Sequence, residues 1–241
     1  VVASEWGAIG GPFQYGDKYA HSAIVSSKET IQSEGPWGVS DKVFNYTVFN
    51  SGSLSKYILR KVPYDFEYAD IQAGIGTPHA VYAEFTADET LLVRAEAQAL
   101  LGHYAEALND LNTELAAFSR EGVQLTLDDV KKFYSDDVTA YYTPEKPTPR
   151  KAFHTAFAIS KDTEEPMLQC ILHLRRIMTI HEGLRMQDVK RYGITIYRRD
   201  VKSNYKITGI TDTMEARDPR LAIQLPQDVI TAGVTPNPRN K

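Results

Sequence analysis

Several short patterns in the sequence could carry chemistry, and each lacks a part that the chemistry needs. The segment 11–18 has the glycine spacing of a phosphate-binding loop, but Tyr19 stands where a magnesium-binding hydroxyl is required. Ser53 and Lys56 have the spacing of a serine nucleophile and its lysine base, yet the partner motifs of that enzyme class are missing. The sequence therefore disfavours nucleotide binding and serine hydrolysis.

The carboxylates, histidines and cysteine give no stronger catalytic signal. Asp65, Glu67 and Asp70 could supply the two carboxylates of a glycosidase, but an acidic surface turn is the simpler interpretation. Cys170 is the single cysteine, so it forms no intrachain disulfide. The histidines show no metal-binding spacing: His21, His79, His103, His154, His173 and His181. We expect no catalytic residue, no metal site and no cofactor.

A dense set of opposite charges surrounds Gly183. Its members are Arg175, Arg176, Glu182, Arg185, Asp188, Lys190 and Arg191. They could bind an anion, but their alternating signs favour an internal ion-pair network that ties two helical pieces together. We expect Arg185 and Asp188 to pair, and Glu182 and Gly183 to have a structural role with them.

Aromatic side chains are concentrated near the start of the chain. Residues 1–85 hold 14 of the 25 aromatic residues and 9 of the 15 glycines, without helical periodicity. Trp37 lies in a Gly-Pro-Trp-Gly turn, which could hold the indole outward as a flat surface for the C–H face of a sugar. Trp6, Tyr15 and Tyr19 are its expected companions. The alternative is that Trp37 is a core residue under a loop.

From Thr86 onward the pattern becomes helical. A helix capped by Thr86 and ended by Gly102 should be followed at once by a second over 104–118, giving an antiparallel hairpin with alanines at the crossing. We expect a short helix at about 128–134 and a further helical region that begins near Pro166, is interrupted by Gly183 and ends at Gly193. Short strands are predicted at 43–49, 195–199 and 205–210.

Composition sets the broad class. The chain has 241 residues, a net charge of −4 and 42% hydrophobic residues, as ordinary globular proteins do, and a basic stripe for nucleic acid is missing. The predicted fold is mainly α with irregular loops and short strands. Its parts are a loop-rich ligand region (1–85), a helical hairpin (86–120), a polar insertion (121–165) and a closing helical region (166–241), together in one structural domain.

Several segments, taken together, resemble a known family. Residues 91–111, LLVRAEAQALLGHYAEALNDL, resemble a tetratricopeptide helix pair. With KYILRKV at 56–62, RRIMTIHEGLRMQDVKRYG at 175–193, and DPRLAIQLPQDVI with TPNPRN near the end, the order of segments resembles the C-terminal part of the SusD/RagB family of nutrient-binding outer-membrane lipoproteins. The family's EGxRxxDxxRxG block is matched by Glu182, Gly183, Arg185, Asp188, Arg191 and Gly193. Thr86, Leu174 and Met178 depart from the family pattern at positions that often carry charge.

The resemblance implies a protein without catalytic activity that binds oligosaccharides for import through a SusC-type TonB-dependent transporter. Peptide binding in the RagB manner is the first alternative, a tetratricopeptide adaptor between proteins is the second, and a glycosidase using Asp65 or Glu67 is the last. The implied location is the extracellular face of the outer membrane, through a lipid anchor that this chain lacks. We therefore expect a fragment of a longer protein, with an exposed apolar patch near Leu101 and Ala105 larger than the ~300 to 600 Å² usual for a monomer.

Overall fold

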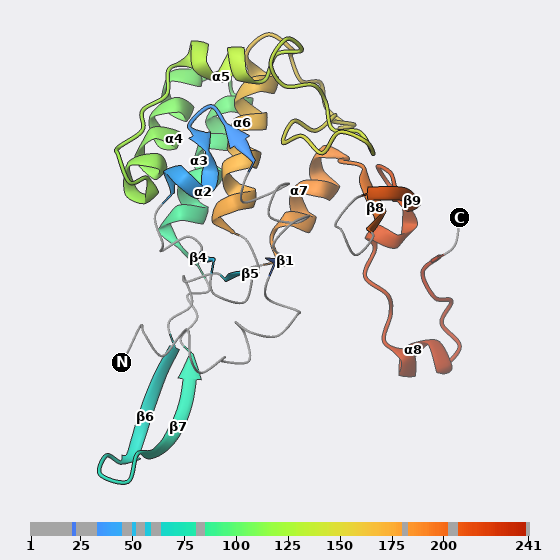
Figure 1. Ribbon diagram of the computed structural model, residues 1–241. Coiled ribbons are helices and arrows are strands. Elements are labelled where there is room, and N and C mark those ends of the chain that lie inside the picture. Colours follow the sequence, from blue (N-terminus) through green and yellow to red (C-terminus); the bar gives the residue numbers. More distant parts are fainter. Residues whose placement is uncertain are drawn as a thin grey trace.

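The computed structural model describes residues 21–22, 33–44, 50–51, 56–58, 64–80, 85–179, 183–201 and 207–239. Within these ranges the protein is helix-rich with short antiparallel strand pairs (Figure 1). The α-helices there are α2 (Ser40–Val43), α3 (Ala87–Leu100), α4 (Tyr104–Phe118), α5 (Leu127–Phe133), α6 (Glu164–Met178), α7 (Arg185–Tyr192) and α8 (Gln227–Thr231). A 3₁₀ turn, η2, spans Pro219–Leu221.

The described strands are short and pair only antiparallel. β1 (His21–Ser22), β5 (Lys56–Ile58) and β4 (Asn50–Ser51) form one sheet in that order. Three two-stranded pairs complete the set, namely β2 (Glu34–Gly35) with β3 (Gly38–Val39), β6 (Tyr64–Asp70) with β7 (Ile75–Ala80), and β8 (Ile196–Val201) with β9 (Ile207–Met214). None of these sheets is broad enough to form a layer of the core, so the helices build it.

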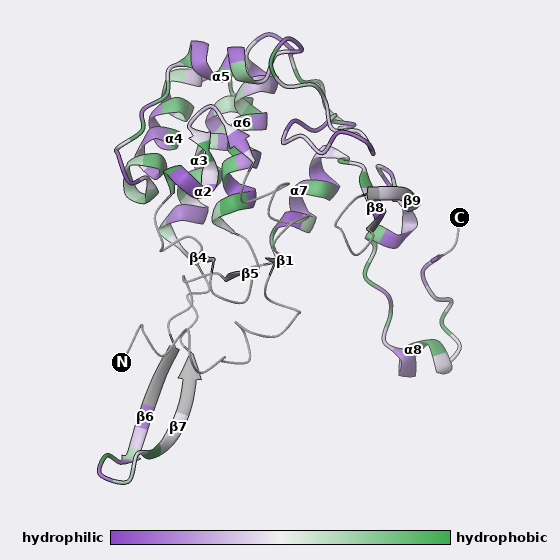
Figure 2. Cartoon of the chain, viewed as in Figure 1, coloured by the Kyte–Doolittle hydropathy of each residue, from purple (hydrophilic) through white to green (hydrophobic). Residues whose placement is uncertain are grey.

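Helix α6 lies at the centre of the core, packed against α3, α4 and α5. Its side chains are buried on every face from residue 165 to residue 175. Hydrophobic residues recur along α3, α4 and α6 (Figure 2), and those at the contacts include Leu92, Ala95 and Ala99 of α3, Ala107, Leu111 and Leu115 of α4, and Leu168, Ile171 and Leu174 of α6. Small alanines on α3 and α4 allow the two helices to approach closely.

Local signals in the sequence explain where the helices begin and end. Thr86 accepts a hydrogen bond from the Glu89 amide at the start of α3, and Thr126 forms a full capping box with Asp129 at the start of α5. Gly193 ends α7 at φ 59°, where an added Cβ would lie 2.4 Å from the His154 carbonyl oxygen. The helices expected between Thr86 and Gly102, over 104–118 and at about 128–134 are confirmed. The helix expected to begin near Pro166 begins at Glu164 and is α6.

The polar segment 121–165 is held against the core by side chains that form hydrogen bonds with its backbone. Gln169 of α6 accepts a hydrogen bond from the Lys151 amide (2.9 Å) and donates one to the Lys151 carbonyl (2.5 Å). Arg150 is buried, forms an ion pair with Asp136 (2.6 Å) and donates to the Thr139 carbonyl (3.1 Å). This polar, proline-rich segment can therefore pack against buried α6, because Gln169 satisfies both backbone groups of Lys151.

The strand predictions are partly right. β8 and β9 confirm the two predicted near the C-terminal end. The strand expected over 43–49 is wrong at its start, because Val43 ends α2 and Phe44 forms an isolated bridge with Ser119; residues 45–49 lie outside the described part of the chain. Glu67 lies in the strand β6, whereas only Asp70 borders the turn, so the predicted acidic turn is a longer hairpin.

Leu101 and Ala105 are exposed, as expected from the fragment hypothesis. Beside Ala105 lies a groove between α3 and α4, whose other lining residues are polar, namely Arg94, Gln98, Glu106, Asn109 and Asp110. Arg94 and Asp110 join across it through two hydrogen bonds of 2.9 and 2.6 Å. The exposed apolar positions are thus adjoined by a polar groove, and an apolar patch of unusual size stays a prediction.

Candidate functional site

A buried guanidinium links three helices of the core. Arg175 of α6 donates to a Glu96 carboxylate oxygen of α3 at 2.6 Å and to an Asp188 oxygen of α7 at 2.8 Å. It also donates to the Leu92 carbonyl at 3.1 Å. The three charged side chains are only 5–8% exposed. Burial alone would lower the pKa of Arg175, but the charges of Asp188 and Glu96 outweigh it and raise that pKa.

Each carboxylate of this network has further donors. Arg185 reaches Asp188 at 3.4 Å, which confirms the predicted internal pair. Glu96 also forms an ion pair with Arg191 at 2.9 Å and accepts a hydrogen bond from the Tyr192 hydroxyl at 2.6 Å. Burial, followed by the hydrogen bond to Glu96, raises the pKa of Tyr192 above its usual range, so this hydroxyl stays a proton donor. Of the charges predicted to form an internal network around Gly183, Arg175, Arg185, Asp188 and Arg191 therefore do so.

Glu96 is the member of the network that sequence reasoning missed. It is 79 residues from Arg175 and lies between apolar positions of a predicted amphipathic helix. The one available signal was a carboxylate beside Ala95 on the expected buried face. Gly183 has φ 81°, which explains a glycine between α6 and α7, and Glu182 lies outside the described residues.

Trp37 is a core residue, so the prediction that it forms an exposed ligand platform is wrong. Its side chain is 5% exposed, and its indole nitrogen donates to the Ser40 hydroxyl at 3.0 Å. The ring packs on Phe44 and on His173 of α6, with centroid distances of 5.6 and 4.9 Å. The turn folds the indole inward because α6 offers a buried aromatic partner, and Gly35 leaves room for it.

The companions proposed for Trp37 are not placed. Trp6, Tyr15 and Tyr19 lie outside the described residues. Of the predicted ligand-binding side chains, the structure therefore places only Trp37, and places it in the core.

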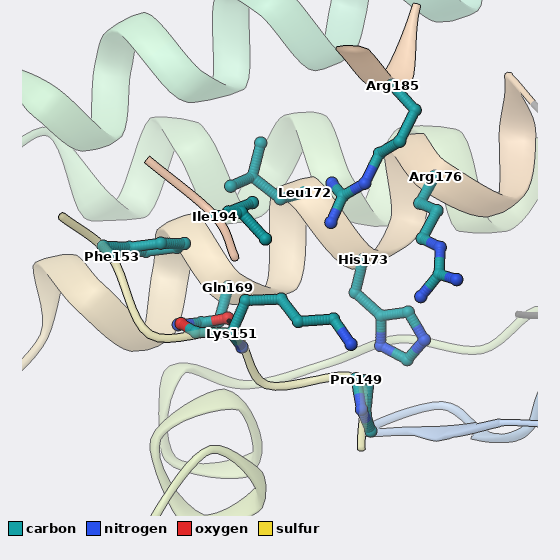
Figure 3. A pocket seen from close by; sticks show the side chains of 9 residues that line it. All are labelled: Pro149, Lys151, Phe153, Gln169, Leu172, His173, Arg176, Arg185 and Ile194. Atoms are coloured by element: carbon teal, nitrogen blue, oxygen red, sulfur yellow. Dashed lines mark hydrogen bonds between the residues drawn. The ribbon is translucent and has the colours of Figure 1, made fainter. Parts of the chain in front are cut away.

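A small hollow lined by three cationic side chains adjoins this aromatic cluster (Figure 3). The charged ends of Lys151, Arg176 and Arg185 lie around the imidazole of His173. The volume of the hollow is about 10 Å³, which is room for one water molecule. Burial, with the neighbouring Arg176 as a second cause, lowers the pKa of Arg185 to about 10. The hollow is too small for a sugar or a peptide, so we assign it no ligand.

The imidazole of His173 is neutral, and each of its two nitrogens has a hydrogen-bond partner. Its Nε2 lies 2.9 Å from the Ser33 hydroxyl and its Nδ1 lies 3.0 Å from the Tyr134 hydroxyl. Burial lowers the pKa of His173 well below 6.5, and the charges of Arg176 and Lys151 lower it further. These contacts join the segment 33–44 and the segment after α5 to α6, which indicates a structural role.

The described ranges hold no group of three potential metal ligands, and no helix in them is long and apolar enough to cross a bilayer. Burial raises the pKa of the Cys170 thiol far above its usual range. Comparison with protein-family models, with curated proteins and with solved structures gives no match.

Replacing Asp188 with alanine should destabilise the protein strongly. The change removes one carboxylate partner of buried Arg175 and leaves its charge less well compensated, which costs about 3–5 kcal/mol for a buried pair. Chemical denaturation measures this loss. The matched control is Asp137→Ala, at an exposed aspartate, which should change the free energy of unfolding by less than about 0.5 kcal/mol. Equal effects of the two substitutions would contradict the structural assignment.

His173 should make stability fall on mild acidification. Below about pH 6.5 the unfolded chain binds a proton at this imidazole that the folded protein does not bind, since the folded-state pKa is lower. The free energy of unfolding should therefore decrease by up to about 1.4 kcal/mol per pH unit below that point. In His173→Gln this contribution should vanish. The exposed His103→Gln controls for the loss of an imidazole, and an unchanged slope in His173→Gln would refute the account.

Proposed function

We propose that this chain is part of a SusD/RagB-like protein that binds oligosaccharides without catalysis, at the cell surface, for import through a SusC-type transporter. The observation that carries the proposal is the contact between two of the segments that resemble the family. Glu96, in the segment 91–111, and Asp188, in the segment 175–193, both bind the guanidinium of Arg175. Two motifs of one family scaffold are expected to share a core, and these two do.

The helical hairpin supports the same proposal. α3 and α4 are joined by only three residues, and Ala95, Ala99 and Ala107 are fully buried. We interpret this hairpin as a tetratricopeptide-like unit. In the proposed assembly its outer surface faces the transporter, and a lipid anchor holds the protein at the extracellular face of the outer membrane.

The proposed ligand surface is formed by aromatic residues that precede Trp37 in the sequence. Because Trp37 is buried in the core, the proposal assigns the sugar-stacking role to Tyr15, Trp6 and Tyr19. An open aromatic surface buries little area, so the dissociation constant should be ~10 μM to 1 mM.

Isothermal titration calorimetry with a panel of soluble oligosaccharides tests the proposal. Tyr15→Ala and Trp6→Ala should weaken binding about tenfold or more, since each removes a stacking ring. Trp37→Phe is the matched control: it keeps an aromatic ring in the core and should retain the parent's affinity. Trp37→Ala should instead lower the free energy of unfolding by about 3–5 kcal/mol.

The same panel separates the alternatives. Binding of peptides in place of sugars would favour the RagB-like function, and release of new reducing ends would identify a glycosidase. If Tyr15→Ala and Trp6→Ala stay folded and bind oligosaccharides as the parent does, the assignment of the aromatic surface is wrong.

A further inference from the structure

The hairpin of β6 and β7 extends away from the helical body (Figure 1). Among the described residues these strands pair only with each other. Near the tip Tyr68 is 48% exposed, Ile71 81% and Ile75 62%. Three large apolar side chains within eight residues of one projecting element form a surface that water solvates poorly.

The turn that presents these side chains is well defined. Asp70 Oδ1 accepts hydrogen bonds from the amides of Gln72 (2.9 Å) and Ala73 (3.0 Å), and Gly74 has φ 67°. An aspartate that satisfies the backbone of the turn and a glycine in the left-handed region hold the loop in one conformation. Ile71 is therefore presented at the outer end of the hairpin before any partner arrives, which lowers the entropic cost of binding.

Charge on the hairpin restricts what the tip can contact. Residues 64–80 contain Asp65, Glu67 and Asp70 and no lysine or arginine. An anionic lipid surface would repel these carboxylates, and so would the same hairpin of a second copy. Pro78 has no amide hydrogen to donate at the outer edge of β7, which disfavours the addition of a strand there.

We propose that the tip of the β6–β7 hairpin docks into an apolar pocket of a different protein, and that lysine or arginine side chains border this pocket. Ile71 and Ile75 supply the apolar contact, while Glu67 and Asp70 face the cationic border. This surface is independent of the proposed sugar-binding residues, so either assignment can fail without the other.

Site-specific photocrosslinking in the cells that produce the full-length protein tests this surface. A benzophenone amino acid replaces Ile71, and the matched control carries it at Ile223, an isoleucine of similar exposure (87%) outside the hairpin. Position 71 should give one protein adduct that position 223 does not give. Its mapped site should consist of apolar residues with lysine or arginine beside them, and adding Glu67→Lys should lower the yield about fivefold or more.

Every other result overturns the proposal. These results are an adduct with lipid, an adduct with a second copy of this chain, a crosslink to another segment of the same full-length protein, equal yields at positions 71 and 223, a mapped site without basic residues, an unchanged yield with Glu67→Lys, and no adduct at all. Thermal unfolding of each variant checks that the substitutions, all at exposed positions, leave the fold intact.

Discussion

The burial of one guanidinium constrains how the helices of this protein are arranged. A buried charge is costly unless it is paired, and Arg175 has its partners on two other helices, Glu96 on α3 and Asp188 on α7. If α3 or α7 moved away from α6, a carboxylate or the guanidinium would lose its partner inside the core. The apolar contacts of α6 with α3 and α4 favour association in general, whereas this charge network selects the mutual position of the helices.

Local signals in the sequence predicted most of the helices, because their causes are local. The spacing of apolar residues, the cap at Thr86 and the glycine at Gly193 depend on neighbours within one or two turns. The partner of Arg175 could not be predicted in the same way, since Glu96 comes close only after α3 and α6 have packed. The β6–β7 hairpin was missed because Gly76 and Pro78 weaken the strand pattern of β7, and the alternation in β6 was interpreted as an acidic turn.

The position of Trp37 shows where reasoning from composition fails for the candidate site. A turn rich in glycine and proline permits an indole to point outward or inward, and only the packing of residues 33–44 on α6 decides between them. His173 makes the inward position favourable, because its ring packs on the indole while its nitrogens bind Ser33 and Tyr134. The proposed sugar-binding surface therefore excludes Trp37 and consists of residues that precede it in the chain.

A double-mutant cycle between Glu96 and Arg175 tests most directly whether the buried network holds the helices together. The free energies of unfolding of the parent, Glu96→Gln, Arg175→Met and the double variant would be compared. We predict that the double variant loses about 2 kcal/mol less stability than the sum of the two single losses, because each single change leaves a buried partner without its counter-charge. Losses that add to within about 0.5 kcal/mol would show that the two side chains are not coupled, and would contradict the account.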